Sequence, residues 1–232
     1  MLFTSRPSRR SLTAVAVTVA SAFALSGCIK LDIDMKVKSD TKLDGTMIVA
    51  FNEEVMKSFE GMADGMSTSN TKSKTPTTKA KSFEQQTKDG IKEAQAKLPK
   101  GSSVKLYKEK GWLGQAISFK DVDASLVLGA GLNAGATGGT GTDTSTLKIV
   151  KKGDSLMLDG VLDMGGGTGG GSDAGMDMSG LMAGGKPELR VKFTFPGKVS
   201  SASKGGKISG NSVTWTPEFG KKLIMKATAK AN

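Results

Sequence analysis

The fold is decided by residues 25–38, whose sequence is LSGCIKLDIDMKVK. After the cysteine, apolar and charged side chains alternate without exception from Ile29 to Lys38. The apolar members are Ile29, Leu31, Ile33, Met35 and Val37. In an extended chain, residues two positions apart share a face, so this period of two predicts a half-buried β-strand.

The four residues before the strand are Leu25, Ser26, Gly27 and Cys28. They fit the lipobox of bacterial lipoproteins, in which an aliphatic residue and two small residues precede a cysteine. Small side chains let the extended chain enter a narrow protease cleft, and the thiol accepts a diacylglyceryl group. We therefore expect cleavage after Gly27 and acylation of Cys28. The alternative is that this single cysteine is a buried structural residue of an apolar segment.

Residues 1–27 have the other features of an export signal. Arg6, Arg9 and Arg10 form a basic region, and a fourteen-residue apolar stretch, Leu12–Leu25, follows it. A membrane-spanning helix needs about twenty residues, so we predict a cleaved signal peptide rather than a transmembrane helix. The paired arginines also fit part of a twin-arginine signal, which leaves the export route open.

The charge of the chain is strongly positive. Without the signal peptide, 30 basic residues face 22 acidic ones, which lowers the formal charge from +11 to +8. Arg190 is then the only arginine, and lysine is a hydrated point charge without a bidentate fork. This composition suits attraction to an anionic membrane surface and argues against base-specific recognition of nucleic acid. A solvated lysine-rich surface without a ligand explains the charge equally well.

The rest of the chain alternates strand patterns with turns. Besides the first strand, we predict strands at 43–51, 104–108, 112–119, 147–149, 156–162, 188–195, 213–215 and 223–230. Asn52 is a good N-cap for a short helix, and Ser82 with Gln85 makes a capping box for a second helix through Leu98. Because most strands are joined by short turns, the predicted fold class is α+β, an antiparallel sheet packed on two helices.

Three inserts interrupt this single domain, which spans residues 28–232. They are rich in glycine, serine, threonine or methionine and lie at 62–81, 129–145 and 164–185. Such compositions bury too little apolar surface to offset the entropy of ordering, so we predict mobile loops. No apolar tail follows the last strand, which leads us to expect lipid as the only anchor.

Four stretches carry a family resemblance, and together they touch most of the mature chain. Their sequences are GCIKLD at 27–32, GWLG at 111–114 with Phe119, FPGKV at 195–199 and NSVTWTP at 211–217. They resemble the LppM family of actinobacterial cell-envelope lipoproteins. The resemblance implies an extracytoplasmic domain similar to helix-grip folds that bind hydrophobic ligands, and a link to envelope lipids or glycolipids.

The aromatic residues leave two structures open. If sheet and helix enclose an apolar cavity, some of these side chains line it, and otherwise they fill a solid core. The candidates are Trp112, Phe193, Phe195 and Trp215.

Catalytic motifs are lacking. The chain has no histidine and no Gly-x-Ser-x-Gly elbow. Asp32 and Asp34 share a strand face, but lysines flank them, which favours a solvated charged face over an acid/base pair. Met176, Met178 and Met182 could bind Cu(I), although without histidine or a free thiol they better fit a flexible loop that touches lipid. We expect no enzymatic activity, no metal and no cofactor.

These observations predict a lipid-anchored, non-enzymatic protein on the extracytoplasmic face of the cell membrane. It would bind an envelope phospholipid or glycolipid with an anionic head. The alternative is a structural or protein-interaction module of the envelope with a filled core and no small ligand. The sequence specifies no protein partner.

Overall fold

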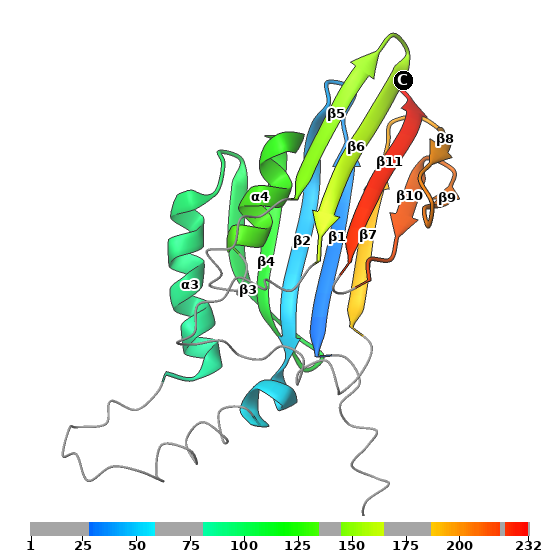
Figure 1. Ribbon diagram of the computed structural model, residues 1–232. Helices are drawn as coiled ribbons and strands as arrows, with labels where there is room; N and C mark the ends of the chain where they lie inside the picture. The colour runs from blue at the N-terminus through cyan, green and yellow to red at the C-terminus, as the bar shows by residue number, and fades with distance from the viewer. Residues whose placement is uncertain (1–27, 59–80, 135–144, 165–186, 219–220, 232) are drawn as a thin grey trace, which may run out of the picture.

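The computed structural model describes residues 28–58, 81–134, 145–164, 187–218 and 221–231, and for residues 130–134 it describes the backbone alone. These residues form two β-sheets with helices on one side (Figure 1). In spatial order, the seven-stranded sheet contains β3 (Ser102–Glu109), β4 (Trp112–Asp123), β2 (Lys42–Asn52), β1 (Ile29–Val37), β7 (Glu188–Thr194), β10 (Ser212–Trp215) and β9 (Lys207–Ser209). The four-stranded sheet contains β5 (Thr146–Lys152), β6 (Ser155–Asp163), β11 (Lys222–Lys230) and β8 (Val199–Ala202).

The first strand forms as its alternation predicts and lies at the centre of the larger sheet. All five apolar residues of β1 are buried, and its charged residues are partly or fully exposed. β2 pairs with it in antiparallel orientation, with Val37 opposite Leu43 across the turn. On its other side, β1 pairs with β7 in parallel orientation, with Leu31 opposite Leu189.

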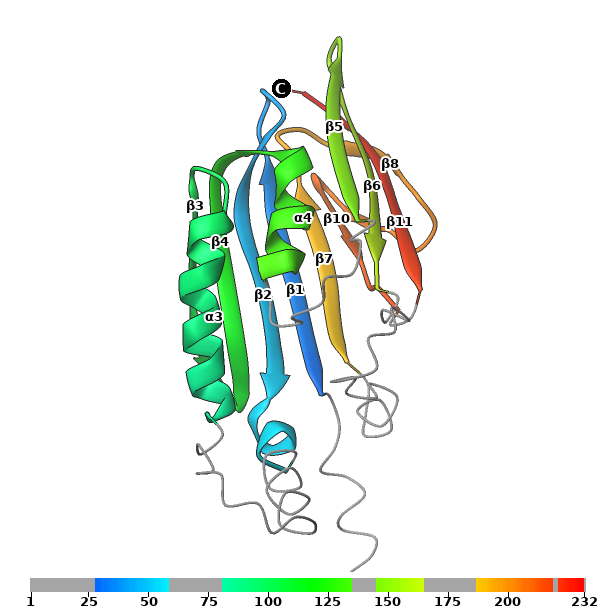
Figure 2. The same ribbon diagram turned by 60° about the vertical axis from the view of Figure 1, so that its left-hand side comes forward.

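The core lies between the layers. Figure 2 shows α3 (Phe83–Lys97), α4 (Ala124–Ala134) and the four-stranded sheet on the same side of the seven-stranded sheet. Side chains from both sheets and from α4 form one buried cluster, which includes Ile33, Leu158 and Val127. The opposite face of the larger sheet carries the charged residues of β1 and β7. We call it the outer face, and the buried side the inner face.

The α+β class is confirmed, but the sheet differs from the expectation of a single antiparallel one. The strands divide into two sheets, and β1 and β7 run parallel. Hydrophobic alternation predicts which face of a strand is buried, but it does not predict the neighbouring strand. No short turn links β1 to β7, because some 150 residues separate them, so nothing local sets their relative direction. The short strands β8 and β9 were also not predicted.

Both predicted helix starts are confirmed. The backbone NH of Val55 donates to Asn52 Oδ1 at 3.4 Å, and residues 53–58 are helical. Ser82 caps α3, accepting from the backbone NH of Gln85 at 3.3 Å, and the helix ends at the C-cap Leu98.

The sequence did not predict α4. Its residues 129–134 fall in the segment expected to be a glycine-rich insert. The helix is apolar on nearly all sides, so it lacks the 3.6-residue period that marks an amphipathic helix. Of the expected mobile inserts, residues 62–80, 135–144 and 165–185 lie outside the described residues. The three methionines considered for Cu(I) belong to the last of these.

Candidate functional site

Cys28 lies at the start of β1 in a small apolar cluster that is separate from the main core. This N-terminal cluster contains Cys28, Ile29, Phe51 and Val55, with Met56 and Phe83 packed against it. Only 6% of Cys28 is exposed, and burial raises the pKa of its thiol. The backbone NH of Asn52 donates to the Cys28 carbonyl at 3.1 Å, which holds the cysteine against the end of β2. Any group carried by the Cys28 sulfur is therefore at this end of the domain, with no spacer.

Phe83 links the N-terminal cluster to α3. Its ring meets the ring of Phe51 edge to face, with 5.8 Å between the centroids. On the inner face of the sheet, Phe51 is opposite Leu113, and the next inner pair is Val49 and Gln115. The interface between α3 and the sheet thus continues from the N-terminal cluster towards Gln115.

Gln115 is a buried polar residue in this helix–sheet interface. It is 2% exposed, and its Oε1 accepts no hydrogen bond from any residue that the structure describes. The helix is close, because a Cβ added to Gly90 would lie 3.7 Å from the Gln115 Nε2. An unpaired buried carbonyl costs about 1–3 kcal/mol, so Gln115 destabilises the fold unless something else donates to it.

Polar contacts hold both ends of α3 to β3. At the N-terminal end, Lys108 donates to Glu84 at 2.8 Å, and together with Lys88 it lowers the pKa of Glu84 to about 2. At the C-terminal end, the backbone NH of Val104 donates to Gln95 Oε1 at 3.0 Å.

The middle of α3 is different, since the two buried residues of the helix are the small Thr87 and Ala94. The helix is therefore tied at its ends, while its middle contributes little apolar volume to the interface.

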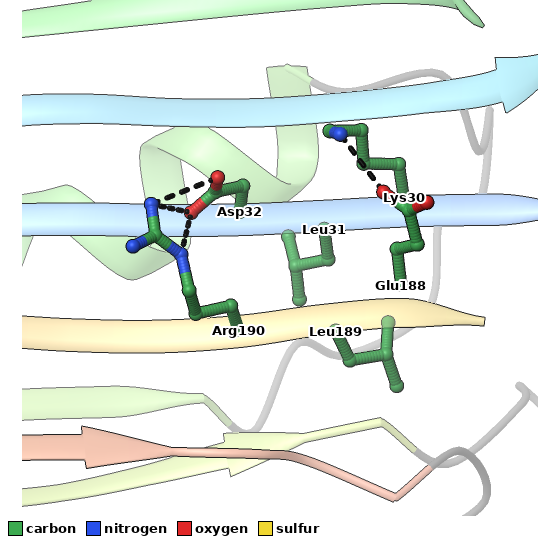
Figure 3. A pocket seen from close by; sticks show the side chains of 6 residues that line it. All are labelled: Lys30, Leu31, Asp32, Glu188, Leu189 and Arg190. Carbon is green, nitrogen blue, oxygen red and sulfur yellow. Dashed lines mark hydrogen bonds and ion pairs between the residues drawn. The ribbon is translucent and has the colours of Figure 1, made fainter.

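The outer face carries a ladder of ion pairs across β1 and β7. Arg190 donates to both carboxylate oxygens of Asp32 at 2.9 Å, and Lys30 donates to Glu188 at 2.9 Å (Figure 3). Lys192 lies 3.4 Å from Asp34. Each pair joins residues that are opposite each other in the parallel register. The expected solvated charged face is therefore an ion-paired one, with Asp32 and Asp34 held by cations.

A hollow of about 210 Å³ lies at this ladder, lined by Lys30, Leu31, Asp32, Glu188, Leu189 and Arg190. In Figure 3 the two ion pairs flank the leucines. The volume is below the roughly 300–1,000 Å³ of pockets that enclose small organic ligands, and the lining is largely charged. The hollow suits water or a small polar group and is unsuited to an acyl chain.

The structure brings three of the four aromatic candidates into one core and leaves Trp112 apart. Trp215 and Phe193 meet edge to face with 6.4 Å between centroids, and Phe195 is buried in the same core. Trp112 is 8% exposed and lies on the outer face, where the Lys30 ammonium is 5.5 Å from its ring centroid. None of the four lines the hollow.

Sequence reasoning missed Gln115, although a signal was present. Leu113, Gln115, Ile117 and Phe119 alternate along β4, and Gln115 is the one polar residue in that row. No group of three Asp, Glu, Cys or His side chains within the described ranges could hold a metal ion.

The family model for the LppM domain matches residues 30–231. The chain belongs to the LppM domain family. LppM membership confirms the resemblance and indicates a lipoprotein-type protein of the cell envelope. Among the helices that the structure describes, none is long and apolar enough to cross a membrane.

One solved relative within the LppM family is the folded domain of Mycobacterium tuberculosis LppM, determined by NMR. The two chains share 16% identity with a TM-score of 0.47, over 88% of this chain and 91% of the other. The comparison with curated proteins found no match.

Proposed function

We propose that this protein is a lipid-anchored envelope domain that binds a phospholipid or glycolipid with an anionic head and catalyses no reaction. Acyl chains on Cys28 hold it to the extracytoplasmic face of the membrane. The observation that carries the proposal is the buried, unpaired oxygen of Gln115 behind the apolar N-terminal cluster.

The position of Cys28 supports the membrane part of the proposal. Because Cys28 is the residue before β1, acylation places the domain against the headgroups, where lipid is the ligand at highest local concentration. Two or more acyl chains give stable anchoring, whereas one alone is marginal. Each lysine near an anionic surface adds roughly 1 kcal/mol of attraction.

The helix–sheet interface supports the lipid-binding part. Because α3 is held to β3 at its ends and packs through the small Thr87 and Ala94, an apolar chain can enter between its middle and the sheet, as in a helix grip. The N-terminal cluster supplies apolar walls at the membrane end. A lipid hydroxyl would then donate to Gln115 Oε1, which removes the cost of leaving that oxygen unpaired.

A structural or protein-interaction module is the second candidate, and one observation favours it. Phe193 and Trp215 have no exposed surface, and Phe195 is 1% exposed. Protein atoms therefore surround these rings in the main core and leave no room for a ligand beside them. In that case the domain has a filled core, and its binding surfaces lie outside.

Replacing Gln115 by methionine separates the two candidates. Methionine has a similar shape and no unpaired oxygen, so Gln115→Met should raise the free energy of unfolding by about 1–2 kcal/mol. The same change should weaken binding of phosphatidylglycerol to the detergent-solubilised chain by roughly tenfold, as expected for one lost hydrogen bond. Urea unfolding and native mass spectrometry measure the two effects.

Gln85→Met is the matched control. Gln85 is exposed on α3, and its side-chain amide donates to the Asp89 carboxylate. It should change neither quantity appreciably. If Gln115→Met stabilises the fold and leaves lipid binding intact, the lipid does not bind at this interface. That result favours the structural or protein-interaction module.

A further inference from the structure

The outer side of the four-stranded sheet combines exposed apolar side chains with lysines. Met157 on β6 is 41% exposed and Ile224 on β11 is 55% exposed. Each has an apolar residue opposite it on the neighbouring strand: Val161 is opposite Ile224, and Val150 is opposite Met157. These pairs face away from the core, because the residues between them along the strands are buried.

The charges on this side are mainly positive. Lys222 and Lys226 form ion pairs with Asp163 at 3.2 Å and with Asp159 at 3.5 Å. Three further lysines project from the same side, and no described carboxylate lies within ion-pair distance of them. These are Lys148, Lys152 and Lys230. Lys148 is opposite Asp159, and Lys152 and Lys230 are both opposite Ser155, which places all three lysines on this side of the sheet.

The outer face of the seven-stranded sheet provides a contrast. Its central cations, Lys30, Arg190 and Lys192, are each held by a carboxylate of β1 or β7. On β1 and β7 that face presents no exposed large apolar side chain. A surface that docks on anionic lipid headgroups needs free cations and some apolar area to insert. The four-stranded sheet offers both on one side, with the exposed side chains of Ile224 and Met157 beside its lysines.

We propose that the outer side of the four-stranded sheet rests on the anionic headgroups of the membrane that carries the protein. Ile224 and Met157 insert between headgroups, and Lys148, Lys152 and Lys230 contact lipid phosphates. Pairing of this side with a second copy is disfavoured, because both copies bring the same unneutralised lysines. The inference rests on the Cys28 anchor proposed above.

The arrangement of the strands fits this orientation. β11 begins at the same end of the molecule as β1 (Figures 1 and 2). Ile224 follows the first residues of β11, so the most exposed apolar side chain lies on the half of the sheet nearer to Cys28. Met157 is opposite Thr228 and Lys230 is opposite Ser155, so they lie towards the other end of this sheet. The domain therefore lies lengthwise on the headgroups, with Ile224 towards the anchored end.

Fluorescent labels on the full-length acylated chain in lipid nanodiscs test the proposal. Met157→Cys places a label on the four-stranded sheet, and Ser103→Cys places the matched label on the outer face of the larger sheet. With phosphatidylglycerol and a quencher attached to lipid headgroups, quenching at Met157→Cys should exceed that at Ser103→Cys several-fold. With phosphatidylcholine alone, or at ~0.5 M salt, where charges are screened within a few Å, the difference should shrink.

Charge reversal provides the specificity control. Lys148→Glu, Lys152→Glu and Lys230→Glu together should abolish the difference between the labels. Reversal of Lys36, Lys105 and Lys207, exposed lysines of the other sheet without a described partner, should preserve it.

Three outcomes overturn the proposal. Equal quenching of the two labels on an acylated chain rejects the docking while leaving the anchor standing. Shielding of Met157→Cys in native membranes but not in nanodiscs indicates a protein partner instead of lipid. The third outcome is a chain without acyl groups, which removes the anchor and with it the orientation. The intact mass of the same sample is recorded first to detect it.

Discussion

Replacing Cys28 by serine is expected to abolish lipid attachment and to leave residues 1–27 on the chain. The thioether needs a thiol, and Cys28 is the only cysteine in the sequence. Cleavage by the lipoprotein pathway requires the modified cysteine, so Cys28→Ser should accumulate as the precursor. Intact mass of the membrane fraction should show residues 28–232 plus acyl groups for the wild type, and the unmodified precursor for the variant.

The control for this experiment is Ser26→Ala, which keeps a small residue before the cut and should be processed like the wild type. A wild-type chain that begins at Ile29 or earlier without acyl mass would contradict the anchor. Cys28 would then be only a buried member of the N-terminal cluster, where its low exposure fits a structural role equally well.

Truncation of Trp215 should cause the largest loss of stability, about 3–5 kcal/mol for Trp215→Ala. The indole has no exposed surface, meets Phe193 edge to face and donates through Nε1 to Ser203 Oγ at 3.2 Å. Removing it leaves a large void and takes one hydrogen-bond donor from Ser203 Oγ, which still accepts from the Lys226 backbone NH at 3.0 Å. Since domains are stable by about 5–15 kcal/mol, urea unfolding should show a shift large enough to populate the unfolded state.

Trp215→Phe is the matched control, because it keeps an aromatic ring and loses the hydrogen bond and part of the volume. It should cost clearly less than the alanine change. A loss below about 1 kcal/mol for Trp215→Ala would contradict the packed core. It would instead show that the ring borders an existing cavity, as the sequence left open.

Local signals in the sequence predicted the elements that local physics controls. The alternation over Ile29–Val37 specified which side of β1 is buried, and Ser82 specified the start of α3. The predicted strands at 104–108 and 112–119 form as the β3–β4 hairpin. Lys110 and Gly111 at its turn both have positive φ, as tight hairpin turns require.

Features that depend on distant contacts could not be predicted in this way. The parallel pairing of β1 with β7 forms between segments that no turn connects, and α4 lacks a polar face that would mark it as a helix. In the site, the motif ending in Cys28 is visible in sequence. By contrast, the unpaired oxygen of Gln115 follows from the way α3 covers β4, which no local pattern encodes.

The central claim is that the domain holds a lipid in addition to its anchor, and a native mass spectrum tests it most directly. The full chain is extracted from its membrane in mild detergent and washed at low salt and at ~0.5 M salt, which removes lipid held only by surface charge. We predict the mass of acylated residues 28–232 plus one further lipid that survives the high-salt wash, since burial of acyl chains is not screened by salt. An acylated chain with no bound lipid even at low salt would contradict the account.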